Sequence, residues 1–304
     1  MRVSEIGSKV VDLVFAKSRL RLYVWLSLIS QILIVVTGGA VRLTASGLGC
    51  PEWPMCTEES LVTVPEMGIH GIIEFGNRLL TFVLVIIAVL TIFTVFRNAR
   101  TGRGLRWPSA ALLAGIPAQA VIGGISVWTN LNPWVVGLHF VLSGALIAIA
   151  ALLLFRTYQP TLEPVTELRW RLSPAIAIVG WVSVLIGVMV TGAGPHSGDA
   201  ESPRNGLDLE LWQHFHSYPG YLLLALSLLQ LTLTLRAERS FFAGWRSRVS
   251  VLLVATITMQ AIVGVIQARM GVPALLVGIH MFGASVAIAL LSLQWLVTSG
   301  RRFD

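Results

Sequence analysis

Apolar residues along the chain form eight long runs, separated by short stretches that carry most of the charge. Each run is long enough for a helix, rising about 1.5 Å per residue, to cross a hydrocarbon layer of about 30 Å. We therefore predict an all-α integral membrane protein with eight transmembrane helices. The predicted spans are Leu22–Leu43, Ile69–Phe96, Pro108–Trp128, Trp134–Phe155, Leu172–Ala193, Trp212–Leu235, Val249–Ala268 and Pro273–Val297.

The composition supports this class and excludes others. Of 304 residues, 55% are hydrophobic and only 12% are charged, which excludes a soluble enzyme and a disordered chain. The formal net charge of +7 does not indicate nucleic acid, because the basic residues lie in short clusters between apolar runs. Two cysteines can form neither a disulfide scaffold nor a four-thiolate metal site.

The positions of lysine and arginine predict the orientation. If the N-terminus is cytoplasmic, 18 of the 22 basic residues lie on the cytoplasmic side, and Arg42, Arg78, Arg204 and Arg269 lie outside. This positive-inside bias predicts that both termini are cytoplasmic and that the two longest connections, 44–68 and 194–211, are extracytoplasmic.

The chain contains an internal repeat. Gln119–Gly123 returns as Gln260–Gly264, and Gly137–Phe140 returns as Gly278–Met281, both with an offset of 141 residues. Each half contains four helices, an even number, so the halves share one orientation and form two tandem, pseudo-symmetric four-helix bundles. The expected divisions are a cytoplasmic segment 1–21, an N-terminal half 22–158, a cytoplasmic linker 159–171, a C-terminal half 172–298 and a cytoplasmic tail 299–304.

The histidines gather at one depth. All six lie in the predicted outer loops or the outer thirds of helices: His70, His139, His196, His214, His216 and His280. Histidines at helix ends can simply sit at the headgroup level, or bond across helices. However, His139 and His280 occupy equivalent places in the repeat, beside the small residues Ser143 and Gly283, which would leave space for a flat group. Two imidazoles at one height in an apolar bundle favour haem over zinc, which needs more ligands.

The second helix of each half should supply the partner. Residues two apart point about 200° apart on a helix, so only one of His214 and His216 faces the bundle. Gly220 lies one turn beyond His216, which favours His216 as the ligand and leaves His214 as the alternative. In the N-terminal half, Glu74 and Asn77 stand where the C-terminal half has Gln213 and His216.

Two further groups each allow two interpretations. Glu74 shares a helix face with His70, Asn77 and Arg78. It is either an ion-pair partner of Arg78 or a catalytic carboxylate that acts as a general base or stabilises a cationic intermediate, and the two roles are compatible. Cys50 and Cys56 flank five residues of the first outer loop and are expected to form a disulfide. That disulfide is either a loop staple or an exposed bridge that exchanges electrons.

At this point several segments resemble a known family. Residues 38–56, which read GGAVRLTASGLGCPEWPMC, closely resemble the signature that follows the first helix of bacterial haem A synthases. The later landmarks of that family resemble Ile73–Arg78, Gly137–His139, Thr191–Asp199 and Gly278–His280. The resemblance covers essentially residues 22–298.

The resemblance implies a membrane enzyme that oxidises a ring methyl of haem O to the formyl group of haem A, for terminal oxidase assembly. It implies haem b between His216 and His280, and a substrate site in the N-terminal half with Glu74 and His139. It also implies that the pair of Cys50 and Cys56 is redox-active.

The chain departs from the commonest family pattern at Asn77, where many members have histidine. His70 precedes Asn77 by seven residues, about 10.5 Å along the axis, so it should not replace the missing ligand unless the helix unwinds or the haem sits higher. We expect His139 alone to hold the N-terminal iron. The second half also has no cysteine pair.

The apolar runs predict a cell-membrane protein, and the positive-inside bias puts the histidines, and with them the haem sites, toward the extracytoplasmic side. The expected partners are haem O, an electron acceptor, the lipid bilayer and, from the pathway, the farnesyltransferase that makes haem O, with a homo-oligomer left open. The alternative function is a diheme b-type cytochrome that only relays electrons, although a relay has no need for an asymmetric first half. A small-molecule transporter would fit the parallel repeat but not the clustered histidines.

Overall fold

The computed structural model describes residues 11–98, 103–238 and 244–299, and it confirms all eight helices. Each helix is long and apolar enough to span a membrane, and the described residues contain no strand. The outer parts of the predicted terminal segments, 1–10 and 300–304, lie outside the described residues. The helices are α2 (Leu20–Leu43), α3 (Gly68–Arg97), α4 (Arg106–Trp128), α5 (Pro133–Tyr158), α6 (Glu167–Ala193), α7 (Leu209–Glu238), α8 (Trp245–Arg269) and α9 (Ala274–Ser299).

Most helices extend beyond the apolar run that predicted them, because polar residues continue the same helix past the hydrocarbon layer. The largest difference is at α6, which begins at Glu167 rather than Leu172. The added turn is stabilised by an exposed ion pair between Glu167 and Arg171, four residues apart and 2.7 Å between Oε1 and Nε. At α5 the start is fixed by Pro133 in the first turn and by the Asn132 side chain, which accepts a hydrogen bond from the Trp134 amide.

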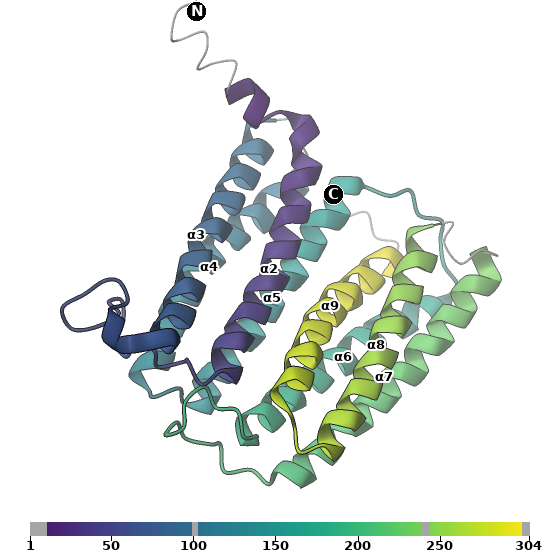
Figure 1. Cartoon of the computed structure of the whole chain (residues 1–304). Helices are drawn as coiled ribbons and strands as arrows, with labels where there is room; N and C mark the ends of the chain where they lie inside the picture. The colour runs from purple at the N-terminus through teal and green to yellow at the C-terminus, as the bar shows by residue number, and fades with distance from the viewer. Residues whose placement is uncertain (1–10, 99–102, 239–243, 300–304) are drawn as a thin grey trace, which may run out of the picture.

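The eight helices form two groups of four that lie side by side (Figure 1). In the first group α2 packs on α3, α3 on α4, α4 on α5 and α5 on α2. In the second group α6 packs on α7, α7 on α8, α8 on α9 and α9 on α6. The groups meet mainly through α2, α5 and α9. The exact axis that relates the halves, and the side on which each end lies, stay predictions.

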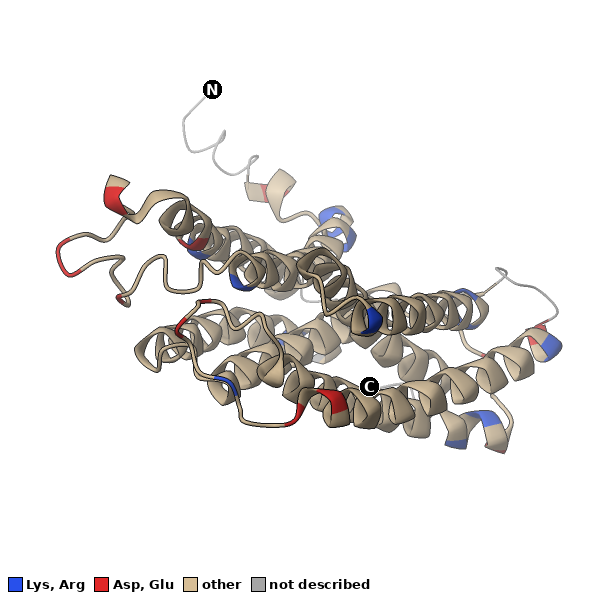
Figure 2. Cartoon of the chain, turned by 60° about the horizontal axis from the view of Figure 1, so that its bottom comes forward, with Lys and Arg blue, Asp and Glu red and all other residues tan. Residues whose placement is uncertain are grey.

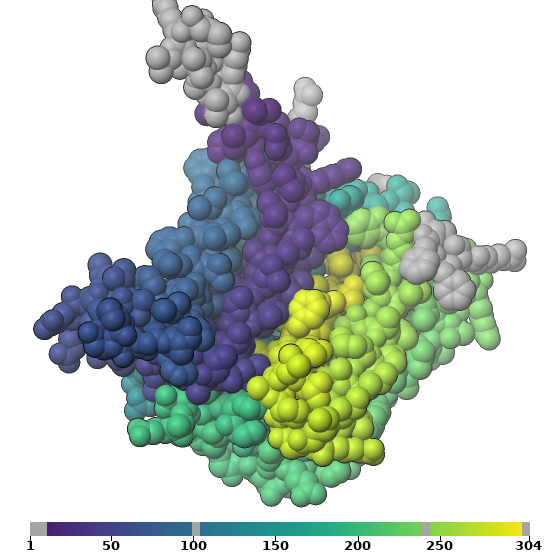
Figure 3. All heavy atoms as spheres, viewed as in Figure 1, coloured from purple at the N-terminus to yellow at the C-terminus, as the bar shows by residue number. Residues whose placement is uncertain are grey.

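The largest hydrophobic core lies where these three helices meet. It contains Val24 and Leu28 of α2, Leu153 and Leu154 of α5, and Ile288 of α9, all 4% exposed or less. Glycine allows one of the close approaches, because a Cβ atom added to Gly39 of α2 would lie 2.6 Å from Cε of Met281. The space-filling view shows the two halves in contact along this seam (Figure 3).

Charged residues lie in the loops and near the helix ends, and the helix middles carry almost none (Figure 2). At the end away from the histidines, the buried Arg246 of α8 donates from Nε to the Val297 carbonyl at 2.7 Å and also binds the Glu163 carbonyl. The residues between the halves are thereby tied to α8 and α9.

Candidate functional site

The helix boundaries place the central histidines at one depth. His139 and His280 each lie six residues after the first residue of their helix, about 9 Å along the axis. His216 lies seven residues into α7, about 10.5 Å from its start. Glu74 lies six residues into α3, so it shares this level. These side chains therefore occupy the same end of both four-helix groups.

In the C-terminal half, the structure brings His216 and His280 together across the bundle. Their ring centroids are 6.2 Å apart and their planes are inclined at 73°. Two imidazoles that bind one metal through bonds of about 2 Å have ring centres about 6 Å apart. His214 is exposed, on the other face of α7. The pair therefore has a separation that fits axial ligation of one haem iron.

Glycines lie directly against these imidazoles. A Cβ atom added to Gly187 would lie 2.9 Å from Cε1 of His216, and one added to Gly264 would lie 3.4 Å from Cε1 of His280. In the N-terminal half, a Cβ atom added to Gly123 would lie 3.4 Å from Cε1 of His139. Nδ1 of His139 and Nδ1 of His280 are buried and have no hydrogen-bond partner. Each of these Nδ1 atoms lies 3.9 Å from the Cβ position of the facing glycine, so the glycines seat the two imidazole rings against α4 and α8.

The small residues named from the sequence have a different role from the one expected. Ser143 does not leave space beside His139, because its hydroxyl accepts a 2.5 Å hydrogen bond from Nε2 of Gln119. Gly283 is covered by Gln260, whose Oε1 would lie 2.2 Å from an added Cβ atom. Each glutamine also donates to the backbone carbonyl of the neighbouring histidine, at 3.2 Å to His139 and 2.9 Å to His280. The repeated glutamines thus fix the histidine backbones, a role that the sequence analysis missed.

Asn77, which the sequence aligns with His216, lies on α3 nine residues after the first residue of that helix. Its Oδ1 is buried and has no hydrogen-bond partner, and its Nδ2 would lie 3.9 Å from a Cβ atom added to Gly38. His70 is exposed, and its Nδ1 hydrogen-bonds the Ser46 hydroxyl at 2.8 Å. The structure therefore ties His70 to the first loop.

Glu74 is 6% exposed, and both carboxylate oxygens have partners. Oε1 accepts from Nη2 of Arg78 at 2.6 Å, and Oε2 accepts from the backbone N–H of Cys50 at 2.6 Å. A buried carboxylate needs such compensation, because its loss of hydration is costly. The carboxylate thus joins α3 to the first loop beside the cysteine pair.

Arg78 continues this connection. Its guanidinium donates to the carbonyl oxygens of Cys50, Glu52 and Met55 at 2.9 to 3.1 Å. One side chain of α3 therefore fixes three backbone groups of the first loop. The ion pair between Glu74 and Arg78 is therefore confirmed. Arg78 also holds the first loop against α3.

Cys50 and Cys56 form a disulfide, as predicted. The expectation that this bridge is exposed is wrong, because both cysteines are 0% exposed. The reason is that the loop folds back on α3 through Glu74 and Arg78. A reductant in solution therefore reaches the sulfurs only after the loop opens.

Arg42, at the end of α2, connects the two halves. Its Nε donates to the His196 carbonyl at 2.5 Å, and its Nη2 donates to the Thr191 carbonyl at 2.7 Å. His196 in turn places Nε2 2.8 Å from the Val272 carbonyl, in the turn between α8 and α9. From the sequence Arg42 was expected only to be an outer basic residue. Its contacts could not be predicted, because they join residues that are 154 and 149 positions apart. His196 belongs to this contact and lies apart from the histidine pair.

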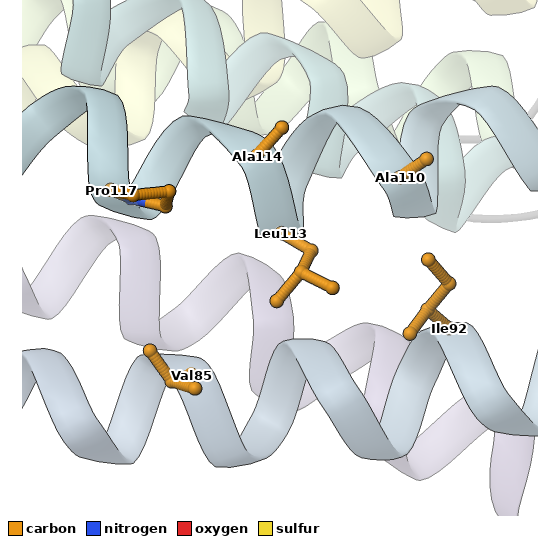
Figure 4. Close-up of a pocket in the computed structure, with 6 residues that line it drawn as sticks. All are labelled: Val85, Ile92, Ala110, Leu113, Ala114 and Pro117. Atoms are coloured by element: carbon orange, nitrogen blue, oxygen red, sulfur yellow. The ribbon is translucent and has the colours of Figure 1, made fainter.

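A groove of about 530 Å³ lies between α3 and α4, and Figure 4 shows six residues that line it. None of the residues that line the groove is titratable. They are Val85, Ile92, Ala110, Leu113, Ala114 and Pro117. On α4, Ala110, Ala114 and Pro117 are exposed, whereas Gln119 and Gly123 of the same helix face His139. The groove therefore belongs to the outer surface. The described residues also contain no group of three or more His, Cys, Asp or Glu side chains able to hold a metal ion.

The fold and these contacts define a class: a multi-pass α-helical membrane protein in which His216 and His280 face each other at a separation that fits haem ligation. Its family follows from comparison with known proteins. The family model of the COX15-CtaA cytochrome oxidase assembly proteins matches residues 21–69 and 62–292. The chain belongs to this family.

Individual relatives agree with this membership. A "Heme A synthase" of Rhizobium etli is 28% identical to the chain, over 91% of the chain and 89% of that protein. A "Heme A synthase" of Rhizobium meliloti is 27% identical, over 92% of the chain and 90% of that protein. Another, of Geobacillus thermodenitrificans, is 30% identical over 49% of the chain and 46% of that protein. The similarity therefore extends over both halves.

Proposed function

We propose that the protein is a haem A synthase, an oxidoreductase that converts a ring methyl of haem O into the formyl group of haem A for terminal oxidase assembly. The membership of the family and the names of the relatives support a role in haem A synthesis. The observation that carries the proposal is the pair of His216 and His280, with ring centroids 6.2 Å apart in one half, whereas the other half has Asn77 at the position that aligns with His216 in the sequence. One half then suits electron transfer and the other suits a substrate.

In the C-terminal half, His216 and His280 would hold haem b as its two axial ligands. A haem with two imidazole ligands supplies one-electron transfer and has no open coordination position. Gly187 and Gly264 leave the imidazoles unobstructed, and Gln260 fixes the backbone of His280. These residues support an electron-transfer site.

In the N-terminal half, His139 would bind the iron of haem O. Asn77 is a poor ligand for iron compared with imidazole, so the opposite position stays open or is taken by water. Glu74 is the carboxylate proposed for catalysis, and Arg78 balances its charge. With water as the oxygen donor, conversion of the methyl group to a formyl group would consume one water and release four protons, while four electrons pass to the electron acceptor. A carboxylate held at the level of His139 can accept a proton or stabilise positive charge there.

The proposed location is the cell membrane, with both termini cytoplasmic and both haem sites toward the extracytoplasmic side. The divisions proposed from the sequence are retained: N-terminal segment 1–21, halves 22–158 and 172–298, linker 159–171 and tail 299–304. The proposed partners are haem O, an electron acceptor and the farnesyltransferase that makes haem O.

Pigment extraction tests this function. The chain is expressed with and without a source of haem O in a host that makes no haem A, and the extracted haems are separated and identified. We expect haem A or its alcohol intermediate only when haem O is supplied. Haem b alone under both conditions would instead support a diheme b-type electron relay.

A further inference from the structure

Trp53 lies between Cys50 and Cys56, and its ring rests on the backbone of α4. A Cβ atom added to Gly124 would lie 2.4 to 2.8 Å from three atoms of the Trp53 ring, so only glycine permits this approach. The ring also packs edge-on against Trp128, with centroids 5.3 Å apart, and Nε1 of Trp128 donates to the Trp53 carbonyl at 3.2 Å. The disulfide loop is therefore docked on α4 through the Trp53 ring and through the hydrogen bond from Trp128 to the Trp53 carbonyl.

The same loop is held on α3 by Glu74 and Arg78, as described above. It thus joins α3 to α4 across the histidine end of the N-terminal half. In Figure 3 the first loop forms a lobe at the lower left of the N-terminal half. The complete burial of both cysteines depends on a loop that is fixed at two sides.

The contact between Trp53 and α4 lies next to the imidazole of His139. Gly123 lies against Cε1 of His139 and Gly124 lies under Trp53, so consecutive residues of one helix seat the histidine and the loop. In the C-terminal half the matching residues are Gly264, which lies against His280, and Val265, which is exposed. The second glycine therefore occurs only in the half that carries the tryptophan loop.

We propose that Trp53 is a positioning residue that closes the Cys50–Cys56 loop over the His139 end of the N-terminal half. Docked on Gly124, the ring keeps the disulfide from thiols and water in solution and holds the α4 turn that supports His139. The effect on a bound haem rests on the function proposed above, whereas the effect on the disulfide does not.

The first test measures how fast the disulfide is reduced in the full-length protein. A water-soluble phosphine converts the disulfide and one water into two thiols and the phosphine oxide, and alkylation followed by intact mass counts the thiols. We expect Trp53→Ala and Gly124→Ala each to be reduced about tenfold faster than wild type, because both increase local opening of the loop. Trp53→Phe should restore slow reduction, since it keeps a flat ring.

Val265→Ala is the matched control, because it changes the equivalent α8 position where no loop docks. Its disulfide should be reduced at the wild-type rate. The double variant Trp53→Ala/Gly124→Ala should react no faster than either single variant, because both changes remove one contact. Unchanged rates in the single variants, or fully additive effects in the double variant, would overturn the proposal.

The second test examines haem and separates this proposal from the proposed function. With haem O supplied, Trp53→Ala should shift the absorption and paramagnetic resonance spectra of the haem bound in the N-terminal half and leave those of haem b unchanged. If wild type binds no haem O, the proposed function fails and the reduction rates still decide the role of Trp53. If haem O is bound but its spectra are the same in Trp53→Ala, the positioning of His139 is refuted.

Discussion

Asn77 of α3 aligns in the sequence with His216 of α7, and the surroundings of the two side chains differ. His216 faces a second imidazole 6.2 Å away between ring centroids. Asn77 carries a buried oxygen without a hydrogen-bond partner, beside Gly38 of α2. An unsatisfied buried polar atom costs about 1–3 kcal/mol, so it is informative where it occurs. At this scale we expect the difference between Asn77 and His216 to separate the chemistry of the two halves.

The two neighbouring histidines of α7 should behave differently when removed. His216→Ala should abolish the low-spin spectrum of haem b, because it deletes one of two facing imidazoles. His214→Ala should leave that spectrum intact, since His214 is exposed. Absorption spectra of the two purified variants compare them directly. Loss of the spectrum in His214→Ala alone would reverse the assignment.

Asn77→His should supply the missing imidazole opposite His139. We expect the N-terminal haem to become low-spin with two imidazole ligands, and turnover to fall at least about tenfold, because the open position is lost. Paramagnetic resonance of the haem O-loaded protein and assays of haem A formation measure both effects. His70→Ala is the control and should change neither, since His70 is bound to Ser46. A wild-type protein that already shows two bis-imidazole haems, one of them lost in His70→Ala, contradicts this interpretation.

Glu74→Gln keeps the shape of the side chain and removes its charge. An amide oxygen can still accept from the Cys50 N–H, so the protein should fold and bind haem. Formation of the formyl product should nevertheless fall by about 100-fold or more, the contribution typical of a positioned acid or base. Extracted pigment is quantified for the variant and for Arg171→Ala, a distant exposed control. Near-normal turnover would reduce Glu74 to a structural partner of Arg78.

At the scale of helices, small residues set how closely neighbours approach. Gly180 of α6 faces Leu291 of α9, and an added Cβ atom would lie 2.4 Å from Cδ1 of that leucine. Leu291 is 2% exposed and belongs to the second hydrophobic core. In a membrane, where lipid is as apolar as the helices, such close packing is a main source of helix association.

Gly180→Val should therefore separate α6 from α9. Overpacking of a close contact costs about 1–3 kcal/mol, so the temperature of unfolding in detergent should fall by several degrees. Gly76→Ala on α3 is the control, because no atom lies within 4 Å of its added Cβ atom. Equal unfolding temperatures for Gly180→Val and wild type would show that α6 and α9 can move apart freely.

For the whole molecule, the contact between halves depends on polar groups as well as on the core between α2, α5 and α9. Arg42 of the first half binds two carbonyl oxygens of the second, and Gly47 donates from its amide to the Gly198 carbonyl at 2.8 Å. Hydrogen bonds from charged groups contribute about 1.5–3 kcal/mol each. These bonds join the two long loops at the histidine end.

Arg42→Ala should loosen this junction. We expect a loss of about 3 kcal/mol in the free energy of unfolding, because two partly buried carbonyls lose a charged donor. Proteolysis near residues 194–208 should also become faster in the intact protein. Arg171→Ala, which breaks only an exposed ion pair, should be close to wild type in both measurements. Identical behaviour of the two variants would show that Arg42 does not hold the halves together.

The sequence by itself determined the eight helices, their approximate ends, the disulfide and the family. Apolar runs of this length have one stable solution in a bilayer, because a helix satisfies its own backbone hydrogen bonds. The ion pair of Glu74 and Arg78 was also predictable, since residues four apart share a helix face. These features depend on residues that are close in sequence or on a long local signature.

Tertiary structure decided which faces and which distant residues meet. In a soluble helix the polar side marks the surface, but here the lipid-facing and buried sides are equally apolar, so periodicity does not reveal the inward face. The burial of Cys50 and Cys56, the docking of Trp53 on Gly124 and the link from Arg42 to Thr191 all join residues that no periodic pattern relates. Each of these contacts forms only when whole helices have packed, because their positions relative to one another are fixed by that packing alone.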